Sequence, residues 1–231
     1  MNNKRVLLIT GTTTILRAPD ETDNFMEEVF DLTLPSKQRY VKKHGYDLMT
    51  LRSFGTDKKG IYNEKDVAFL RIQRPLEMLE QYDIVMWIDA DALITNEDLK
   101  IENFPLEPHI TFYASYDWNG KTSMSTGNFI VQNTPNTEAF ANTFYSLGKR
   151  FSSEQETINA LFWGSDLKHT IKPLEHKFLN AAPTVDMYKE AWATRPPIFA
   201  PWTKDAFLLH LTGCSNKHRI RMLNEYFKEY L

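Results

Sequence analysis

The first ninety residues alternate between short apolar runs and longer segments with helical periodicity, and this alternation restricts the fold more than any other feature. The strand-like runs are 6–10, 46–51 and 84–88, and the helical segments between them are 25–44 and 66–81. Strands that are buried on both faces have nearly continuous apolar runs, and strands that alternate with helices form a parallel sheet covered by helices. We therefore predict an α/β fold with a mostly parallel central sheet flanked by helices.

The remainder of the chain continues this pattern with less regular spacing. Its strand-like segments are 109–117, 127–133 and 207–213, and its helical segments are 137–150, 153–163 and 218–231. Two of the expected helices contain a proline, so we expect a break or a new first turn at Pro35 and a kink at Pro75. A chain of 231 residues without an internal repeat or a clear linker is expected to form a single domain, residues 1–231.

Composition excludes several classes of partner. A net charge of −3 gives no global attraction to nucleic acid or to an anionic membrane. Cys214 is the single cysteine, which excludes an internal disulfide and suits a reducing compartment. No stretch approaches the ~20 apolar residues of a transmembrane helix, and the N-terminal apolar run is too short for a signal peptide. We therefore expect a soluble, cytoplasmic protein without a transmembrane segment.

Two carboxylates follow the third apolar run in the stretch IVMWIDADALITN. Asp89 and Asp91 lie just past the carboxyl end of the expected strand, which is where open α/β sheets bind ligands. Residues i and i+2 of an extended chain point the same way, so both acids can reach one Mg²⁺ or Mn²⁺ ion. A nucleotide diphosphate would complete the coordination. The alternative is that the two aspartates only form a turn or a helix cap, as in many chance occurrences of Asp-x-Asp.

Five segments, in order, resemble the GT-A glycosyltransferases, most closely the family 34 group of galactosyl-, mannosyl- and xylosyltransferases. The segments are KQRYVKKHGYDL (37–48), YDIVMWIDADALITN (82–96), MSTGNFIVQN (124–133), SSEQETINALF (152–162) and LLHLTGCSNK (208–217). The chain departs from the family pattern at Ser125 or Thr126, where the family has Asn, and at Gln132, where it has Arg. We also expect it to lack the usual membrane anchor of the family. The resemblance implies a GT-A fold, in which 1–96 binds the nucleotide and 97–231 holds the acceptor and the C-terminal metal and phosphate motif.

The resemblance also implies a set of metal and donor residues. The metal would be Mn²⁺ or Mg²⁺, with His210 as third ligand beside Asp89 and Asp91; a buried structural histidine is the alternative. The expected donor-binding residues are Thr10, Gly11, Thr12, Arg71, Asp89, Gly213 and Lys217. Lys217 begins the last helix and would contact the diphosphate, whereas His218, Arg219 and Arg221 are expected to form a basic surface.

Catalytic and acceptor residues follow from the same resemblance. Glu154 and Gln155 would lie at the reacting face of the sugar and stabilise positive charge at the anomeric carbon. Ser153 and Glu156 also match a capping box, so this segment has a structural explanation too. The expected acceptor or sugar contacts are Asp117, Trp118, Thr126 and Trp202. Core packing is an equally good explanation for each tryptophan.

The predicted activity is metal-dependent transfer of a sugar from a nucleotide sugar, expected to be a UDP-sugar, to a hydroxyl of a glycan or glycoconjugate. The resemblance implies retention of configuration; inversion would require a base such as Asp117, Glu154 or Asp186. One alternative is a non-catalytic sugar- or metal-binding module of the same fold. The other is an Asp-x-Asp phosphatase, which is disfavoured because the motif follows the third strand and Leu93 occupies the usual Thr or Val position.

Overall fold

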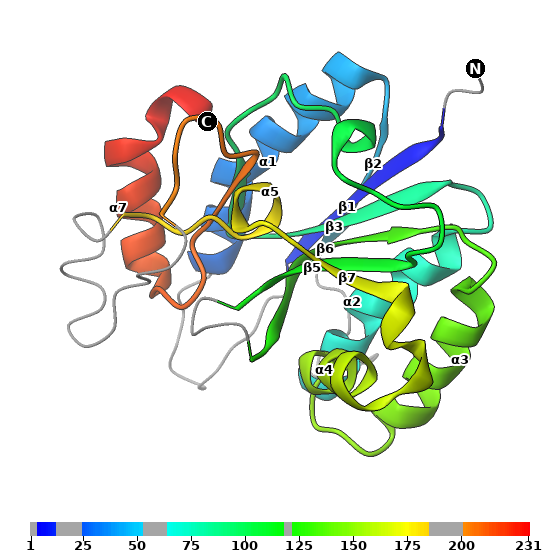
Figure 1. The fold of residues 1–231 in the computed structure, drawn as a ribbon. Coiled ribbons are helices and arrows are strands. Elements are labelled where there is room, and N and C mark those ends of the chain that lie inside the picture. Colours follow the sequence, from blue (N-terminus) through cyan, green and yellow to red (C-terminus); the bar gives the residue numbers. More distant parts are fainter. Residues whose placement is uncertain (1–3, 13–24, 53–63, 118–121, 185–200) are drawn as a thin grey trace.

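The computed structural model describes residues 4–12, 25–52, 64–117, 122–184 and 201–231 (Figure 1). The strands are β1 (Val6–Thr12), β2 (Asp47–Arg52), β3 (Ile84–Asp89), β4 (Ala92–Ile94), β5 (Phe112–Tyr116), β6 (Met124–Gln132), β7 (Ile171–Leu174) and β8 (Leu208–His210). The helices are α1 (Phe25–His44), α2 (Glu64–Met78), α3 (Thr137–Gly148), α4 (Glu154–Gly164), α5 (His176–Leu179) and α7 (Asn216–Tyr226). Short 3₁₀ turns are η1 (Ile101–Asn103), η2 (Asp166–Thr170) and η3 (Lys228–Tyr230).

A six-stranded sheet in the order β2-β1-β3-β6-β5-β7 forms the centre of the molecule (Figure 1). β1 is parallel to both β2 and β3, and β5 is parallel to β7. β6 is antiparallel to its two neighbours, β3 and β5, so it alone runs against the other five strands. The prediction of a mostly parallel sheet is therefore confirmed.

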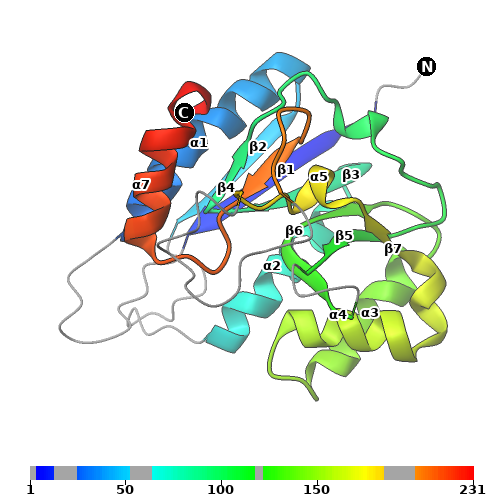
Figure 2. The same ribbon diagram turned by 60° about the vertical axis from the view of Figure 1, so that its left-hand side comes forward.

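Helices cover both faces of this sheet (Figures 1 and 2). Alternate residues of β1 point to opposite faces, as the period of a strand requires: Leu8 joins the core under α1, and Leu7 and Ile9 join the core under α2, α3 and α4. α7 packs beside α1, and a third apolar cluster fills the space between them and the β4–β8 pair. The result is a helix–sheet–helix sandwich that fixes the carboxyl ends of β1 and β3 in place.

The C-terminal part of the chain returns to the end of β3. β8 pairs antiparallel with β4, and this register places His210 opposite Ala92. The backbone N–H of Leu211 also donates to the carbonyl of Asp91, with an N···O distance of 3.1 Å. Residues more than a hundred positions apart in the sequence are therefore neighbours at the carboxyl end of β3.

The expected break at Pro35 was wrong, because α1 continues through it as one helix. Proline removes one helical hydrogen bond, but Val29, Phe30 and Tyr40 remain fully buried on either side of it and keep the helix on the sheet. Pro75 also lies within α2, and a kink there stays a prediction. Two C-terminal elements are shorter than predicted. The strand expected at 207–213 covers only 208–210, and the helix expected at 218–231 begins at 216 and ends at 226.

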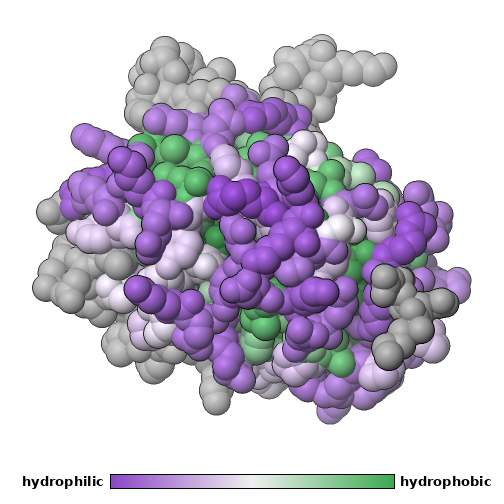
Figure 3. All heavy atoms as spheres, turned by 90° about the horizontal axis from the view of Figure 1, so that it is seen from above, coloured by the Kyte–Doolittle hydropathy of each residue, from purple (hydrophilic) through white to green (hydrophobic). Residues whose placement is uncertain are grey.

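No helix among the described residues could span a membrane. None of the described helices combines the length and apolar character that crossing a bilayer demands. On the face shown in Figure 3, hydrophilic side chains predominate and apolar ones form small, separate groups.

Candidate active site

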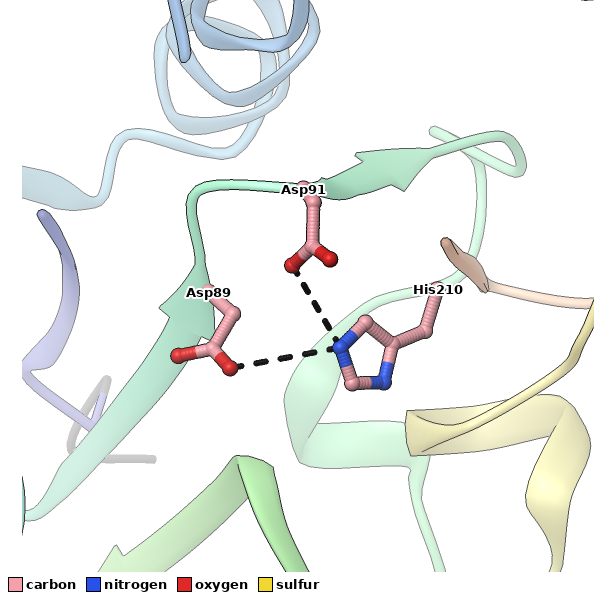
Figure 4. A group of neighbouring side chains, drawn as sticks. All are labelled: Asp89, Asp91 and His210. Atoms are coloured by element: carbon pink, nitrogen blue, oxygen red, sulfur yellow. Dashed lines mark ion pairs between the residues drawn. The ribbon is translucent and has the colours of Figure 1, made fainter. Parts of the chain in front are cut away.

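Asp89, Asp91 and His210 form a triad at the carboxyl end of β3, to which His210 comes from a distant part of the chain (Figure 4). His210 Nε2 lies 3.5 Å from Asp91 Oδ1 and 3.9 Å from Asp89 Oδ2. The three potential ligand atoms all lie within 4.8 Å of one another. Two hard carboxylate oxygens and one imidazole nitrogen, converging on one point, fit an octahedral divalent cation whose other positions face a cavity.

A hydrogen bond fixes the tautomer of His210. Its Nδ1 lies 2.7 Å from Oδ1 of Asn180, whose Nδ2 donates to the carbonyl of Tyr116. Because an amide oxygen can only accept, Nδ1 of His210 carries a proton, and Nε2 is the ring nitrogen that faces the two aspartates. This arrangement of a ligand and its orienting partner is common around protein-bound metals. Sequence reasoning missed Asn180, since no local pattern marks it.

The carboxylate of Asp89 is held in place by Trp87 and Arg71. The Trp87 indole donates to Oδ1 over 2.7 Å, and Arg71 Nη1 lies 3.1 Å from Oδ1 and 3.2 Å from Oδ2. Its backbone N–H donates to Oδ1 of Asn128. Burial raises the pKa of Asp89 above its ordinary value, while the Arg71 guanidinium acts in the opposite direction. A bound cation would favour the ionised form in the same way as Arg71 does.

Asp91 divides its two oxygens between His210 and a second arginine. Oδ1 faces the imidazole, and Oδ2 lies 2.8 Å from Nη2 of Arg219. Burial alone would raise the pKa of Asp91, but Arg219 and His210 together hold it well below its usual range. The carboxylate is therefore ionised and pre-aligned.

Gly127 on β6 leaves the space that the triad needs. A Cβ atom added there would lie 2.6 Å from His210 Cε1 and 2.9 Å from Asp89 Oδ2. The glycine belongs to the MSTGNFIVQN segment, yet its role could not be assigned from the sequence, because the close approach depends on three separate elements.

Helix α1 places a buried amine beneath the Asp-Ala-Asp turn. Thr33 donates to the carbonyl of Ala90 over 2.6 Å, and Lys37 Nζ donates to Thr33 Oγ1 over 3.0 Å. Burial lowers the pKa of Lys37 to about 7, although attraction to Asp91 and Asp89 opposes the shift. α1 thus supports the turn and carries a charge that responds to pH.

The predicted catalytic pair begins α4, and its two side chains lie in different environments. Glu154 is buried, accepts a 2.9 Å hydrogen bond from Thr126 and forms an ion pair with Arg71, which links it to Asp89. Gln155 instead donates to Asp117 Oδ2 over 3.3 Å, as it does to Ser123. The capping reading of this segment is also correct, since Ser153 accepts from the backbone N–H of Glu156.

A cavity of about 270 Å³ opens directly onto the triad. Its lining includes Gly11, Thr12, Met26, Val67, Ala68, Arg71, Trp87, Asp89, Ala90, Asp91, His210, Thr212 and Arg219. Four predicted donor residues are in this set. Thr10 is instead buried within β1, Gly213 is exposed just before α7, and Lys217 is exposed in the first turn of α7. The prediction of Arg219 as a surface residue was wrong, because α7 turns it inward onto Asp91 and leaves its side chain 13% exposed.

The two predicted acceptor tryptophans have different outcomes. Trp202 donates to Thr95 Oγ1 over 2.9 Å and packs edge-on against Phe227 and Tyr230, so a packing role accounts for its position. Trp118, like Asp186, lies outside the described residues.

A family model described as "Protein of unknown function, DUF273" matches residues 37–195, which include the Asp-x-Asp segment. The chain belongs to this DUF273 family. The matched region also contains Gly127, Glu154 and Asn180, but His210 and Arg219 lie beyond it. A comparison with curated proteins finds no match.

Solved structures show the fold of this DUF273 protein. A glycosyltransferase involved in glycosylation of the major capsid of PBCV-1 is 19% identical, with a TM-score of 0.63 over 95% of this chain and 98% of that one. Galactosyltransferase LgtC, solved with donor and acceptor sugar analogues, is 10% identical, with a TM-score of 0.54 over 97% and 100%. Mouse xyloside xylosyltransferase 1 is 9% identical, with a TM-score of 0.52 over 91% and 98%. The chain therefore has the GT-A fold, as predicted.

Proposed function

We propose that this protein is a metal-dependent glycosyltransferase that moves a sugar from a nucleotide sugar to a hydroxyl of a glycan or glycoconjugate. The observation that carries the proposal is the convergence of Asp89, Asp91 and His210 on one point at the mouth of a cavity. Similarity in fold to enzymes that carry out galactosyl and xylosyl transfer supports it. The coordination chemistry favours Mn²⁺ or Mg²⁺.

The donor would lie along the carboxyl ends of β1 and β3. Gly11 and Thr12 line the cavity at the end of β1, where backbone groups and the Thr12 hydroxyl can meet the base and ribose. Thr12 Oγ1 is buried, and the described part of the protein gives it no partner, so it can donate to a ligand. We expect the nucleotide to be uridine diphosphate, on the resemblance noted above.

The chain's residues would stabilise the leaving group mainly through charge. When bound, the divalent cation would supply Lewis-acid neutralisation of the diphosphate as the glycosidic bond breaks. Asp89 and Asp91 would hold that cation through their carboxylate oxygens, and His210 would hold it through Nε2. Negative charge builds on the departing diphosphate in the transition state, so fixed positive groups in the cavity contribute most to the rate.

The sugar would sit between the triad and the start of α4. Glu154 lies there as a buried carboxylate, tied to the triad through Arg71, and Gln155 faces Asp117. These carboxylate and amide groups can stabilise positive charge at the anomeric carbon, and Asp117, Trp118, Thr126 and Trp202 are the proposed sugar and acceptor contacts. We propose retention of configuration, in line with the resemblance to family 34. Residues 1–96 would bind the nucleotide, and 97–231 would complete the site.

A panel of nucleotide sugars tests the proposal. The purified chain is incubated with each donor and Mn²⁺, and release of the nucleoside diphosphate is measured by chromatography, since many transferases slowly hydrolyse their donor in the absence of acceptor. Turnover of one UDP-sugar above the others is the expected result. A protein that binds Mn²⁺ and UDP but turns over no donor, with or without glycan acceptors, would instead be a binding module.

A further inference from the structure

Arg219 is built into the wall of the cavity by three contacts. Its Nη2 pairs with Asp91 Oδ2 at 2.8 Å, Nη1 donates to Oδ1 of Asn216, and Nε donates to the carbonyl of Leu211 over 3.1 Å. A guanidinium has five N–H groups, and the described residues accept from three of them. Among the described residues, the second N–H of each terminal nitrogen has no acceptor, and Arg219 lines the cavity.

The position of Arg219 places two kinds of cation around one carboxylate. A metal at the triad would bind Asp91 through Oδ1, which faces His210, while Arg219 holds Oδ2. A divalent cation and a guanidinium on opposite oxygens of one buried carboxylate repel each other, and a partly enclosed site screens this repulsion weakly. An anion that contacts both cations removes the conflict.

A diphosphate is an anion of the required charge and size. Arg219 lies one turn into α7, close to the end of that helix with free backbone N–H groups, and its planar fork can hold two phosphate oxygens. Lys217, by contrast, is exposed on the same helix. The cavity lining thus presents Arg219, and not Lys217, to a diphosphate that reaches the triad.

We propose that Arg219 couples the binding of metal and nucleoside diphosphate: it opposes the metal while the diphosphate is absent and binds the diphosphate when both are present. This inference rests on the proposed function, because it assumes a metal and a nucleoside diphosphate in the cavity. It makes the binding of the two ligands cooperative, so that neither ligand binds tightly alone, and it assigns the phosphate contact to Arg219.

Two binding measurements on the full chain test this coupling. Mn²⁺ binding without nucleotide is followed by electron paramagnetic resonance, and UDP binding at saturating Mn²⁺ is followed by calorimetry. In Arg219→Gln, we expect Mn²⁺ alone to bind about five times more tightly, and UDP with Mn²⁺ to bind at least about ten times more weakly, within the usual range of coupling between sites. The opposite signs of the two changes are the signature of the coupling.

Two further variants separate this coupling from general damage to the site. Arg221→Gln removes the same charge from α7, but Arg221 is exposed and pairs with Glu225, so both affinities should stay within about twofold of wild type. Arg219→Lys keeps the charge and should leave Mn²⁺ affinity close to that of wild type while UDP binds less tightly.

The possible failures are distinguishable. If Arg219→Gln binds Mn²⁺ alone as well as wild type or more weakly, Arg219 only supports Asp91 and the coupling is overturned. The same conclusion follows if Arg219→Lys behaves like wild type for UDP and Arg219→Gln does as well. If the wild-type chain binds neither Mn²⁺ nor UDP, the proposed function fails first.

Discussion

A single methyl group added at Gly127 is expected to disturb the site. The Cβ of Gly127→Ala would overlap His210 Cε1 and Asp89 Oδ2, so at least one ligand must move. We expect Mn²⁺ affinity to fall by more than about tenfold, because coordination depends on ligand positions to within a few tenths of an ångström. Mn²⁺ titration followed by electron paramagnetic resonance measures this loss.

Gly164→Ala provides the matched control for that substitution. Gly164 ends α4, and its added Cβ would meet nothing within 4 Å. Mn²⁺ binding should therefore be unchanged in this variant. Equal Mn²⁺ affinity in the Gly127 and Gly164 variants would contradict the close approach of β6 to the triad.

Lys37 gives the stability of the protein a pH dependence. Its pKa in the folded protein is about 7, well below its ordinary value of 10.5, so between these values folding releases a proton from the lysine. The free energy of unfolding therefore rises with pH across this window, by up to about 1.4 kcal/mol per pH unit from this one group. The destabilisation caused by burying the charged amine is greatest below pH 7.

The substitution Lys37→Met isolates this contribution. Urea unfolding at pH 7.5 and 9.5, with chelator present, should show wild type gaining stability relative to the methionine variant as the pH rises. Methionine fills a similar volume without a charge, so other titrating groups cancel in the difference. A constant difference between the two proteins would show that Lys37 keeps its ordinary pKa in the folded state.

At the residue scale, the sequence predicted the three members of the triad but not the residues that support them. Asp89 and Asp91 have a local signature, since two carboxylates follow a buried strand, whereas His210 was predicted from the resemblance. Asn180, Gly127 and Arg219 have none. Their roles depend on which atoms of distant elements face each other, and the side of α7 that carries Arg219 was not decided by its basic segment.

Helix α4 shows how one element can serve stability and the site together. Its N-cap Ser153 accepts from the backbone N–H of Glu156, and the next residue, Glu154, joins Arg71 beside the triad. Ser153→Ala should lower the free energy of unfolding by about 1 kcal/mol, because a helix N–H group loses its acceptor. Urea denaturation measures the change.

Ser146→Ala is the comparison for this helix-cap substitution. Ser146 is exposed within α3, where alanine is the better helix former, so the free energy of unfolding should stay the same or rise slightly. A loss as large as that of Ser153→Ala would mean that the effect is not one of capping.

At the element scale, long elements could be predicted and short ones could not. α1 was expected at 25–44 and spans those residues, because its twenty positions carry a clear apolar periodicity. β4, β7 and α5 have only three or four residues each, too few to show a period. The pairing of β4 with β8, which brings His210 to the triad, therefore had no signal in the sequence other than the resemblance.

The triad connects the C-terminal part of the chain to the end of β3, since His210 lies far along the chain from the two aspartates. A metal that binds only the folded protein should stabilise it, by about 2.7 kcal/mol when its concentration is one hundred times the dissociation constant. We expect Mn²⁺ with UDP to raise the midpoint of thermal unfolding of wild type and to leave His210→Ala unchanged. An equal rise in both proteins would place the ion elsewhere.

At this scale, the sandwich architecture could be predicted from the alternation of strands and helices, but the reversed strand β6 could not. An antiparallel strand within a parallel sheet has the same apolar run as its neighbours, and its direction depends on the connection made by the chain. The position of Asp89 beside the end of β1 was correctly predicted, because the parallel strands β1 and β3 end at the same edge of the sheet.

We propose that sugar transfer from a nucleotide sugar depends on a divalent cation held by Asp89, Asp91 and His210. The most direct measurement is the rate of UDP release from the preferred UDP-sugar in wild type with Mn²⁺, in wild type with excess chelator, and in Asp91→Ala and His210→Ala with Mn²⁺. We expect turnover in the first case and a loss of at least about a hundredfold in the other three. Full activity in either variant, or in the presence of the chelator, would contradict it.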